Sequence, residues 1–144
     1  MKYYVVVDTN VLVSASLKPE SNPGIIFRLV DEGIIISLIN DGIMNEYRLV
    51  LSRAKFSFPQ ELVNAVLETM ENRAIKIIED HIEIELPDEK DRVFYEVVMK
   101  SNEVRNSRLV TGNIKHFPAK SFVVTPKELC DIILNDLKMA GEAI

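Results

Sequence analysis

Short apolar runs alternate with longer amphipathic segments along this chain, and this alternation constrains the fold more than any other feature of the sequence. The clearest runs are residues 3–7 and 34–39, and the other strand candidates are residues 74–78, 107–111 and 121–125. Apart from Ser37, the clearest runs are apolar throughout rather than alternating, as expected of parallel strands that are buried on both faces of a sheet. The pattern therefore predicts an α/β fold, a three-layer α/β/α arrangement with a central, mainly parallel sheet.

The amphipathic segments between these runs predict the helices. They cover residues 21–33, 40–53, 59–73, 88–102 and 125–140. Capping residues and a first-turn proline support two of the starts, because Asn22 and Pro23 open the first segment and Asn40 or Asp41 opens the second. Residues 81–86 (HIEIEL) alternate between apolar and polar, so we expect a half-exposed extension or an edge strand there.

Length and composition indicate one soluble domain over residues 1–144, with 47% apolar and 27% charged residues. No apolar run approaches the roughly 18 residues that a membrane-spanning helix needs. The N-terminus lacks a basic region followed by a long apolar core, so we expect no signal peptide. Cys130 is the only cysteine, which excludes an intramolecular disulfide and favours a cytoplasmic location.

The net charge of −5 argues against broad electrostatic attachment to nucleic acid. A negative net charge does not exclude binding of a polyanion, however, because an enzyme whose carboxylates hold metal ions binds the polyanion through those ions.

Polar side chains follow three of the predicted strands directly. Asp8 comes after residues 3–7, Asn40 and Asp41 come after residues 34–39, and residues 111–113, with Thr111 and Asn113, close the strand candidate at 107–111. Ligands of open parallel sheets bind outside the carboxyl ends of the strands, near the point where the strand order reverses. Asp8 is therefore a candidate metal ligand on a rigid strand end, with capping of a nearby backbone amide as the alternative.

Glu46 lies in the second predicted helix next to Tyr47 and Val50, at the border of the apolar stripe. It is a candidate site residue if that border faces the carboxyl ends of the strands. The alternative is an exposed helical acid that pairs with Arg53 or lies near Arg48.

Asp88 and Asp91 are three residues apart at the start of the fourth predicted helix, so they share one face. Asp88 is also a natural N-cap, with Asp91 completing a capping box. Asp91 is the better functional candidate, because Phe94 and Val98 turn its side of the helix toward the core.

Carboxylates that gather in one place raise one another's pKa unless cations neutralise them. Oxygen ligands suit Mg²⁺ or Mn²⁺. The two histidines, His81 and His116, are isolated in the sequence, so a zinc cluster is not expected.

Four motifs, in this order, resemble PIN-domain proteins. They are VVVDTNVLVSA, IMNEYRLVLSR, DEKDRVFYEVV, and LVTGNIKHFP followed by VVTPKEL, and they span essentially the whole chain. The resemblance is closer to the toxin components of prokaryotic toxin–antitoxin pairs. It implies a single PIN-like domain, metal-dependent RNA cleavage that leaves a 5′-phosphate and a 3′-hydroxyl, a cognate antitoxin protein as partner, and a homodimer.

The resemblance also implies roles for individual residues. The catalytic set is Asp8, Glu46, Asp91 and Asn113. Asp8 and Asp91, with Glu46 directly or through water, are the implied ligands of one or two Mg²⁺ or Mn²⁺ ions. The implied supporting residues are Asn10, Asp88 and Thr111. The family commonly has aspartate where this chain has Asn113, and this missing charge leaves the number of metal ions open.

Basic side chains near these motifs are candidates for contacting RNA, and each is explained equally well as solvated surface charge. They are Arg48, Arg53 and Lys115, with Lys18 and Lys120 as further candidates and His116 as a residue that approaches the substrate.

Two other functions stay open at this point. One is a catalytically weak or inactive PIN-like module that binds RNA or metal. The other is phosphotransfer on Asp8, as in phosphatases or receiver domains. Phosphatases of the haloacid-dehalogenase type need a second aspartate at the position of Asn10, which disfavours that variant.

Overall fold

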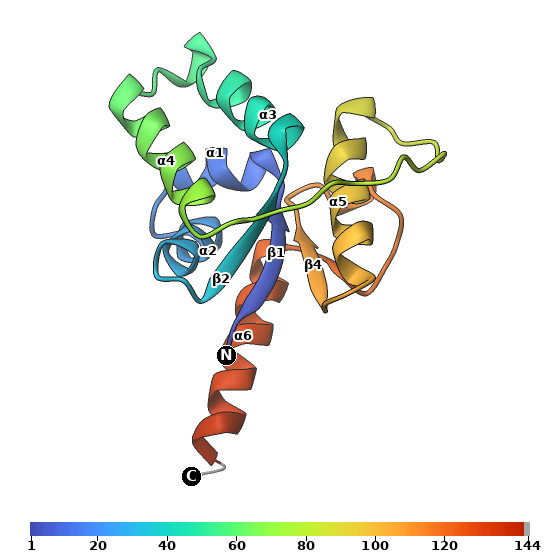
Figure 1. Ribbon diagram of the computed structural model, residues 1–144. Coiled ribbons are helices and arrows are strands. Elements are labelled where there is room, and N and C mark those ends of the chain that lie inside the picture. Colours follow the sequence, from blue (N-terminus) through green and yellow to red (C-terminus); the bar gives the residue numbers. More distant parts are fainter. Residues whose placement is uncertain (143–144) are drawn as a thin grey trace.

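The computed structural model describes residues 1–142, and Figure 1 shows their arrangement. The elements are β1 (Tyr3–Val7), α1 (Thr9–Leu17), α2 (Asn22–Asp31), β2 (Ile35–Ile39), α3 (Asp41–Leu51), α4 (Gln60–Asn72), β3 (Ile75–Lys76), α5 (Arg92–Asn102), β4 (Ser107–Val110), β5 (Val123–Val124) and α6 (Pro126–Glu142). Three short 3₁₀ turns complete the set: η1 (Ala54–Phe56), η2 (Glu89–Asp91) and η3 (Ile114–His116).

The strands form one sheet in the order β3-β2-β1-β4-β5, and every neighbouring pair is parallel. β1 lies at the centre, with Tyr3 opposite Ile35 of β2 and Val7 opposite Val110 of β4. Every residue of β2 is buried, which is why all but Ser37 are apolar, and the Ser37 hydroxyl donates to the Met70 carbonyl. The prediction of a mainly parallel central sheet is confirmed.

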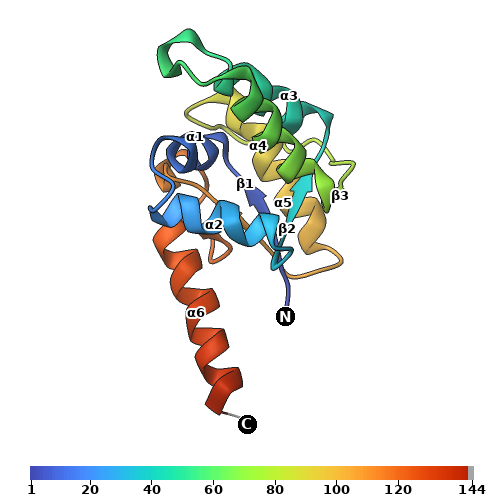
Figure 2. The same ribbon diagram turned by 90° about the vertical axis from the view of Figure 1, so that its left-hand side faces the viewer.

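Helices cover both faces of the sheet, as Figures 1 and 2 show. α5 packs against β1, β2 and β4 on one face, whereas α2 packs against β2, α1 and α6 on the other. The tyrosine hydroxyl of Tyr3 donates a hydrogen bond to Asp136 Oδ2 at 2.8 Å, which ties α6 to β1. The predicted three-layer α/β/α class is therefore confirmed. No helix within residues 1–142 is long and apolar enough to cross a membrane.

Helix α1 is absent from the sequence prediction. Thr9, Val11 and Val13 are β-branched and lower the helix propensity of this segment. Thr9, Val11, Leu12 and Ala15 are all buried, so no polar face marks the helical period. The helix forms because its burial in the tertiary structure outweighs its weak local preference.

Two predicted helix starts are corrected by the structure. Ser21, not Asn22, is the N-cap of α2, and its hydroxyl accepts a hydrogen bond from the Gly24 backbone amide at 3.3 Å. The fourth predicted helix begins as the 3₁₀ turn η2 and becomes α-helical at Arg92. Asp88 does cap this turn, but its carboxylate accepts from the backbone amide of Lys90 at 3.0 Å, so no capping box forms.

Residues 81–86 form no strand, although their burial alternates as the sequence predicted. Side chains of α5 bond to this segment in place of a neighbouring strand. Glu96 accepts from the Ile82 backbone amide at 2.7 Å, and Arg92 donates to the carbonyl oxygens of Ile82 and Ile84. These bonds fix the segment that leads into Asp88.

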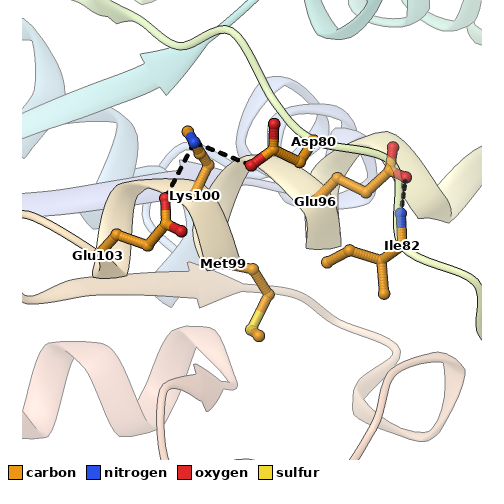
Figure 3. Close-up of a pocket in the computed structure, with 6 residues that line it drawn as sticks. All are labelled: Asp80, Ile82, Glu96, Met99, Lys100 and Glu103. Atoms are coloured by element: carbon orange, nitrogen blue, oxygen red, sulfur yellow. Dashed lines mark hydrogen bonds and ion pairs between the residues drawn. The ribbon is translucent and has the colours of Figure 1, made fainter.

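Figure 3 shows the pocket of about 210 Å³ between this segment and α5. The ammonium group of Lys100 lies between the carboxylates of Asp80 and Glu103, at 2.8 and 3.1 Å. None of the predicted site residues lines this pocket, and its polar groups hold the loop against the helix.

Candidate active site

Asp8 and Thr111 meet at the carboxyl edge of the sheet, directly after the paired residues Val7 and Val110. The backbone amide of Asp8 donates to the Val110 carbonyl at 2.9 Å, and the Thr111 hydroxyl donates to Asp8 Oδ2 at 2.7 Å. The chain runs from β1 through α1 and α2 to β2, which pairs with one side of β1, whereas β4 pairs with the other side of β1. This is the reversal of strand order at which parallel sheets bind ligands.

Asp8 is only 5% exposed, and three donors hold its carboxylate. Oδ1 accepts from the Thr9 backbone amide at 2.8 Å, whereas Oδ2 accepts from Thr111 and, at 3.2 Å, from Asn10 Nδ2. Asp8 therefore caps α1 and faces the strand-end pocket at the same time, so the two interpretations of its role are compatible.

Burial raises the pKa of Asp8 to about 6 from its ordinary value of 3.8. The negative charge of Asp91 raises this pKa further, whereas the hydrogen bonds from Thr111 and Thr9 and the neighbouring His116 lower it. The carboxylate is thus ionised near neutral pH at a free-energy cost that a nearby cation would reduce.

The loop after β4 is fastened to the loop after β1. Asn10 Oδ1 accepts from the Gly112 backbone amide at 3.0 Å, and the Asn113 amide donates to Thr111 Oγ1 at 3.0 Å. A Cβ atom at position 112 would lie in van der Waals contact with Asn10 Oδ1, at 3.4 Å, so the two loops pack closely here. Asn10 and Thr111 are therefore placed to orient Asp8.

Two helices bring further acids to this edge. Tyr47 of α3 is fully buried, and its hydroxyl donates to the Val7 carbonyl at 2.5 Å. This bond anchors α3 to the end of β1, next to Glu46. Glu46 is half-buried and, within the part of the chain that the structure describes, forms no ion pair with Arg48 or Arg53.

Asp91 lies at the start of α5, and its side chain is 14% exposed. Its Oδ2 atom is 3.1 Å from Nδ1 of His116. Burial raises the pKa of Asp91, and the charges of Asp88 and Glu46 raise it further, whereas the contact with His116 lowers it. The acids of α3 and α5 therefore act on one another electrostatically.

These side chains line one pocket of about 250 Å³. Its lining residues are Asp8, Thr9, Asn10, Glu46, Val50, Arg53, Asp88, Lys90, Asp91, Phe94, Asn113 and His116. The structure thus brings all four predicted catalytic residues together, with Asn10, Asp88 and Arg53, while the buried Thr111 supports Asp8 from behind. Arg48 and Lys115 do not line this pocket.

Lys90 lines the pocket without having been predicted there from the sequence, and His116, which was predicted only to approach the substrate, lines it next to Asp91. The sequence pattern presented His116 as isolated, whereas the 3₁₀ turn η3 brings it to Asp91. Residues three apart eclipse one another in a 3₁₀ turn, so the spacing of Asn113 and His116 is the signal that could have revealed it. His81 is not isolated either, since it contacts Glu83 at 2.8 Å and Glu96 at 3.1 Å.

Within residues 1–142, no group of three or more His, Cys, Asp or Glu side chains is arranged to hold a metal ion. The donor set still fits Mg²⁺ or Mn²⁺, because Mg²⁺ keeps several waters and needs only one or two carboxylates besides substrate phosphate. Asp8 and Asp91, whose pKa values are raised by burial and by neighbouring carboxylates, are the residues that would hold it, with Glu46 nearby.

A family model described as PIN domain matches residues 4–115, more than three quarters of the chain. The match contains every lining residue of the pocket except His116, which directly follows it. Comparisons with curated proteins and with solved structures gave no match.

Proposed function

Because this chain belongs to the PIN-domain family, we propose that it is a metal-dependent endoribonuclease that hydrolyses RNA phosphodiester bonds in the pocket around Asp8. PIN domains are in general nucleases that use divalent metal ions. The observation that carries the proposal is the convergence of Asp8, Glu46, Asp91 and Asn113 on one pocket at the reversal of strand order.

The residues divide the work of such a reaction. Asn10 and Thr111 fix the carboxylate of Asp8, and His116 orients that of Asp91. An ion held by Asp8, Asp91 and Glu46 would supply a bound water of lowered pKa and positive charge next to the scissile phosphate.

Two cationic side chains, Arg53 and Lys90, line the same pocket as the acids. Positive charge at that position stabilises the phosphate oxygens of a bound RNA. Asn113 contributes a neutral oxygen and keeps the total negative charge of the pocket lower than an aspartate would.

The resemblance of the four sequence motifs to toxin components extends the proposal. In this role the ribonuclease acts in the cytoplasm, a cognate antitoxin protein restrains it, and the active form is a homodimer. The products are a 5′-phosphate and a 3′-hydroxyl.

A second candidate function is a PIN-like module that binds RNA or metal and cleaves weakly or not at all. Asn113 favours it, because a neutral side chain stands where the family commonly has an aspartate. Calorimetry with Mn²⁺ near neutral pH separates the two, since absence of binding at millimolar metal favours the second function. Phosphotransfer on Asp8 gains no support from the family match.

The direct test measures RNA cleavage by purified protein in Mn²⁺, with Asp8→Asn and the control Asp31→Asn, an exposed acid at the end of α2. Loss of a metal ligand should lower the rate by more than about 100-fold, because loss of a residue that only orients a ligand already costs about 10–100-fold. The control removes the same charge and should cleave normally. Equal rates for wild type and Asp8→Asn would show that the cleavage belongs to another site or to a contaminant.

A further inference from the structure

A second pocket, of about 480 Å³, lies next to the candidate active site. Its lining residues are Ile114, Lys115, Phe117, Ala119, Lys120, Ser121, Val123 and Glu128. Phe117 and Val123 are buried, at 6% and 4% exposure, and Ile114 is 38% exposed. The volume is within the range of about 300–1,000 Å³ that small-molecule sites occupy, and much of the lining is apolar.

The 3₁₀ turn η3 separates this pocket from the active-site pocket. Asn113 and His116 line the active-site pocket, whereas Ile114 and Lys115 line the second one. Asn113 and Ile114 are consecutive residues, as are Lys115 and His116, so only the width of this one turn separates the two pockets. A polymer with its scissile bond in one pocket therefore reaches the other with an adjacent unit.

The rim of the second pocket carries two lysines, Lys115 and Lys120. Neither forms an ion pair with any residue in the range 1–142. Glu128, the acid on the rim, forms a capping box with Thr125 at the start of α6. The Glu128 carboxylate accepts a hydrogen bond from the Thr125 backbone amide at 3.0 Å, and Thr125 Oγ1 accepts one from the Glu128 backbone amide at 3.1 Å. In a chain of net charge −5, this rim carries two lysines against one carboxylate and so has a local excess of positive charge.

A third pocket, of about 200 Å³, shares Asn10 and Asn113 with the active-site pocket. No lysine or arginine lines it. The third pocket is smaller and lacks the cationic side chains that bind a polyanion. The second pocket is therefore the better binding site for the part of the RNA next to the scissile bond.

We propose that the second pocket holds one unpaired nucleotide of the RNA next to the scissile phosphate, an inference that rests on the proposed function. The base lies against Ile114 and Phe117, and Lys115 and Lys120 contact the flanking phosphates. A base enters such a pocket only when it is unstacked and unpaired.

The experiment measures binding of a fluorescent single-stranded RNA to protein that carries Asp8→Asn, so that cleavage does not interfere. Lys115→Ala/Lys120→Ala is compared with Lys76→Ala/Lys138→Ala, which removes two exposed lysines elsewhere. Loss of two phosphate contacts should reduce the steepness of log K for RNA binding against log salt concentration by about 1.4. The ratio of the affinities of the Asp8→Asn parent and the lysine variant should therefore fall about sevenfold as salt rises from about 50 to 200 mM. The control pair should leave the slope unchanged.

A second variant tests the seat of the base. Ala119→Trp fills the pocket from an exposed position and should weaken RNA binding without changing the salt slope, because no charge is removed. Duplex RNA of the same sequence should bind more weakly than the single strand and respond less to Ala119→Trp.

Two results would overturn the inference: a salt slope in Lys115→Ala/Lys120→Ala equal to that of the parent, or single-stranded and duplex RNA that respond equally to Ala119→Trp. The proposed function fails separately, if protein with an intact Asp8 cleaves no RNA although the lysine-dependent binding is observed.

Discussion

The buried carboxylate of Asp8 makes the stability of the metal-free protein depend on pH in a direction opposite to that of most acids. The pKa of Asp8 is about 6 in the folded chain and 3.8 ordinarily, so between these values the folded state binds the proton more tightly than the unfolded state does. The contribution of Asp8 to the free energy of unfolding is therefore largest below pH 3.8 and is lost as the pH rises through 6. The difference of about 2 in pKa corresponds to about 3 kcal/mol.

The substitution Asp8→Asn removes this term, because an amide does not ionise. Relative to wild type, the variant should gain about 2 kcal/mol of unfolding free energy between about pH 4.5 and 7.5. For a chain of about 150 residues this corresponds to a Tm difference that grows by about 4–8 °C. If the side-chain amide in Asp8→Asn forms weaker hydrogen bonds than the carboxylate, the free energy of unfolding of the variant is lowered by the same amount at every pH.

The assay is urea unfolding in the presence of a chelator at a series of pH values, with Asp31→Asn as the control for loss of one charge. A free-energy difference between Asp8→Asn and wild type that stays constant from pH 4.5 to 7.5 would refute the raised pKa. Adding Mn²⁺ in place of the chelator should stabilise wild type by about 2.7 kcal/mol at 100 times Kd and should leave Asp8→Asn unchanged.

Three further predictions concern other positions. His116→Ala should weaken Mn²⁺ binding about 10–100-fold by calorimetry, with partial recovery in His116→Gln, and unchanged affinity in both would exclude an orienting role. Asn113→Asp should raise Mn²⁺ affinity and lower metal-free stability, because it adds a carboxylate to an acidic pocket; a change in neither calorimetry nor urea unfolding would place this side chain outside the site. Gly24→Ala puts a methyl group into the Pro19 carbonyl and should lower the free energy of unfolding by about 1–3 kcal/mol. The control Gly141→Ala has open space around the new methyl group and should be neutral or slightly stabilising in the same urea assay. Equal effects of the two substitutions would show that the predicted clash is absent.

The strands of the sheet could be predicted from the sequence because their burial is visible in short runs of consecutive residues. Strands buried on both faces are apolar at nearly every position, as residues 3–7 and 34–39 are, and the one exception, the buried Ser37, donates its hydroxyl to the Met70 carbonyl. The meeting of Asp8 with Thr111 then follows, since parallel strands end at the same edge. Helix α1 could not be predicted, because its burial leaves no amphipathic period in the sequence.

The remaining differences arise from contacts between distant side chains and backbone. Residues 81–86 look like an edge strand, but their hydrogen-bond partners are Arg92 and Glu96 of a helix, which no strand pattern encodes. His116 reaches Asp91 because the short turn η3 follows the end of β4 and brings the imidazole to the start of α5.

The order of the strands has a consequence for the growing chain during synthesis. β1 can pair with β2 early, but β4, the strand on its other side, is made much later, and Thr111 follows Asp8 by 103 residues. At about 5–20 residues per second, about 5–20 s separate the two residues on the ribosome. Until then Asp8 lacks the side of the pocket formed by Asn113 and His116. If the chain is the proposed nuclease, its active site is therefore incomplete until Asn113 and His116 have been made, and cleavage is expected only near the end of translation.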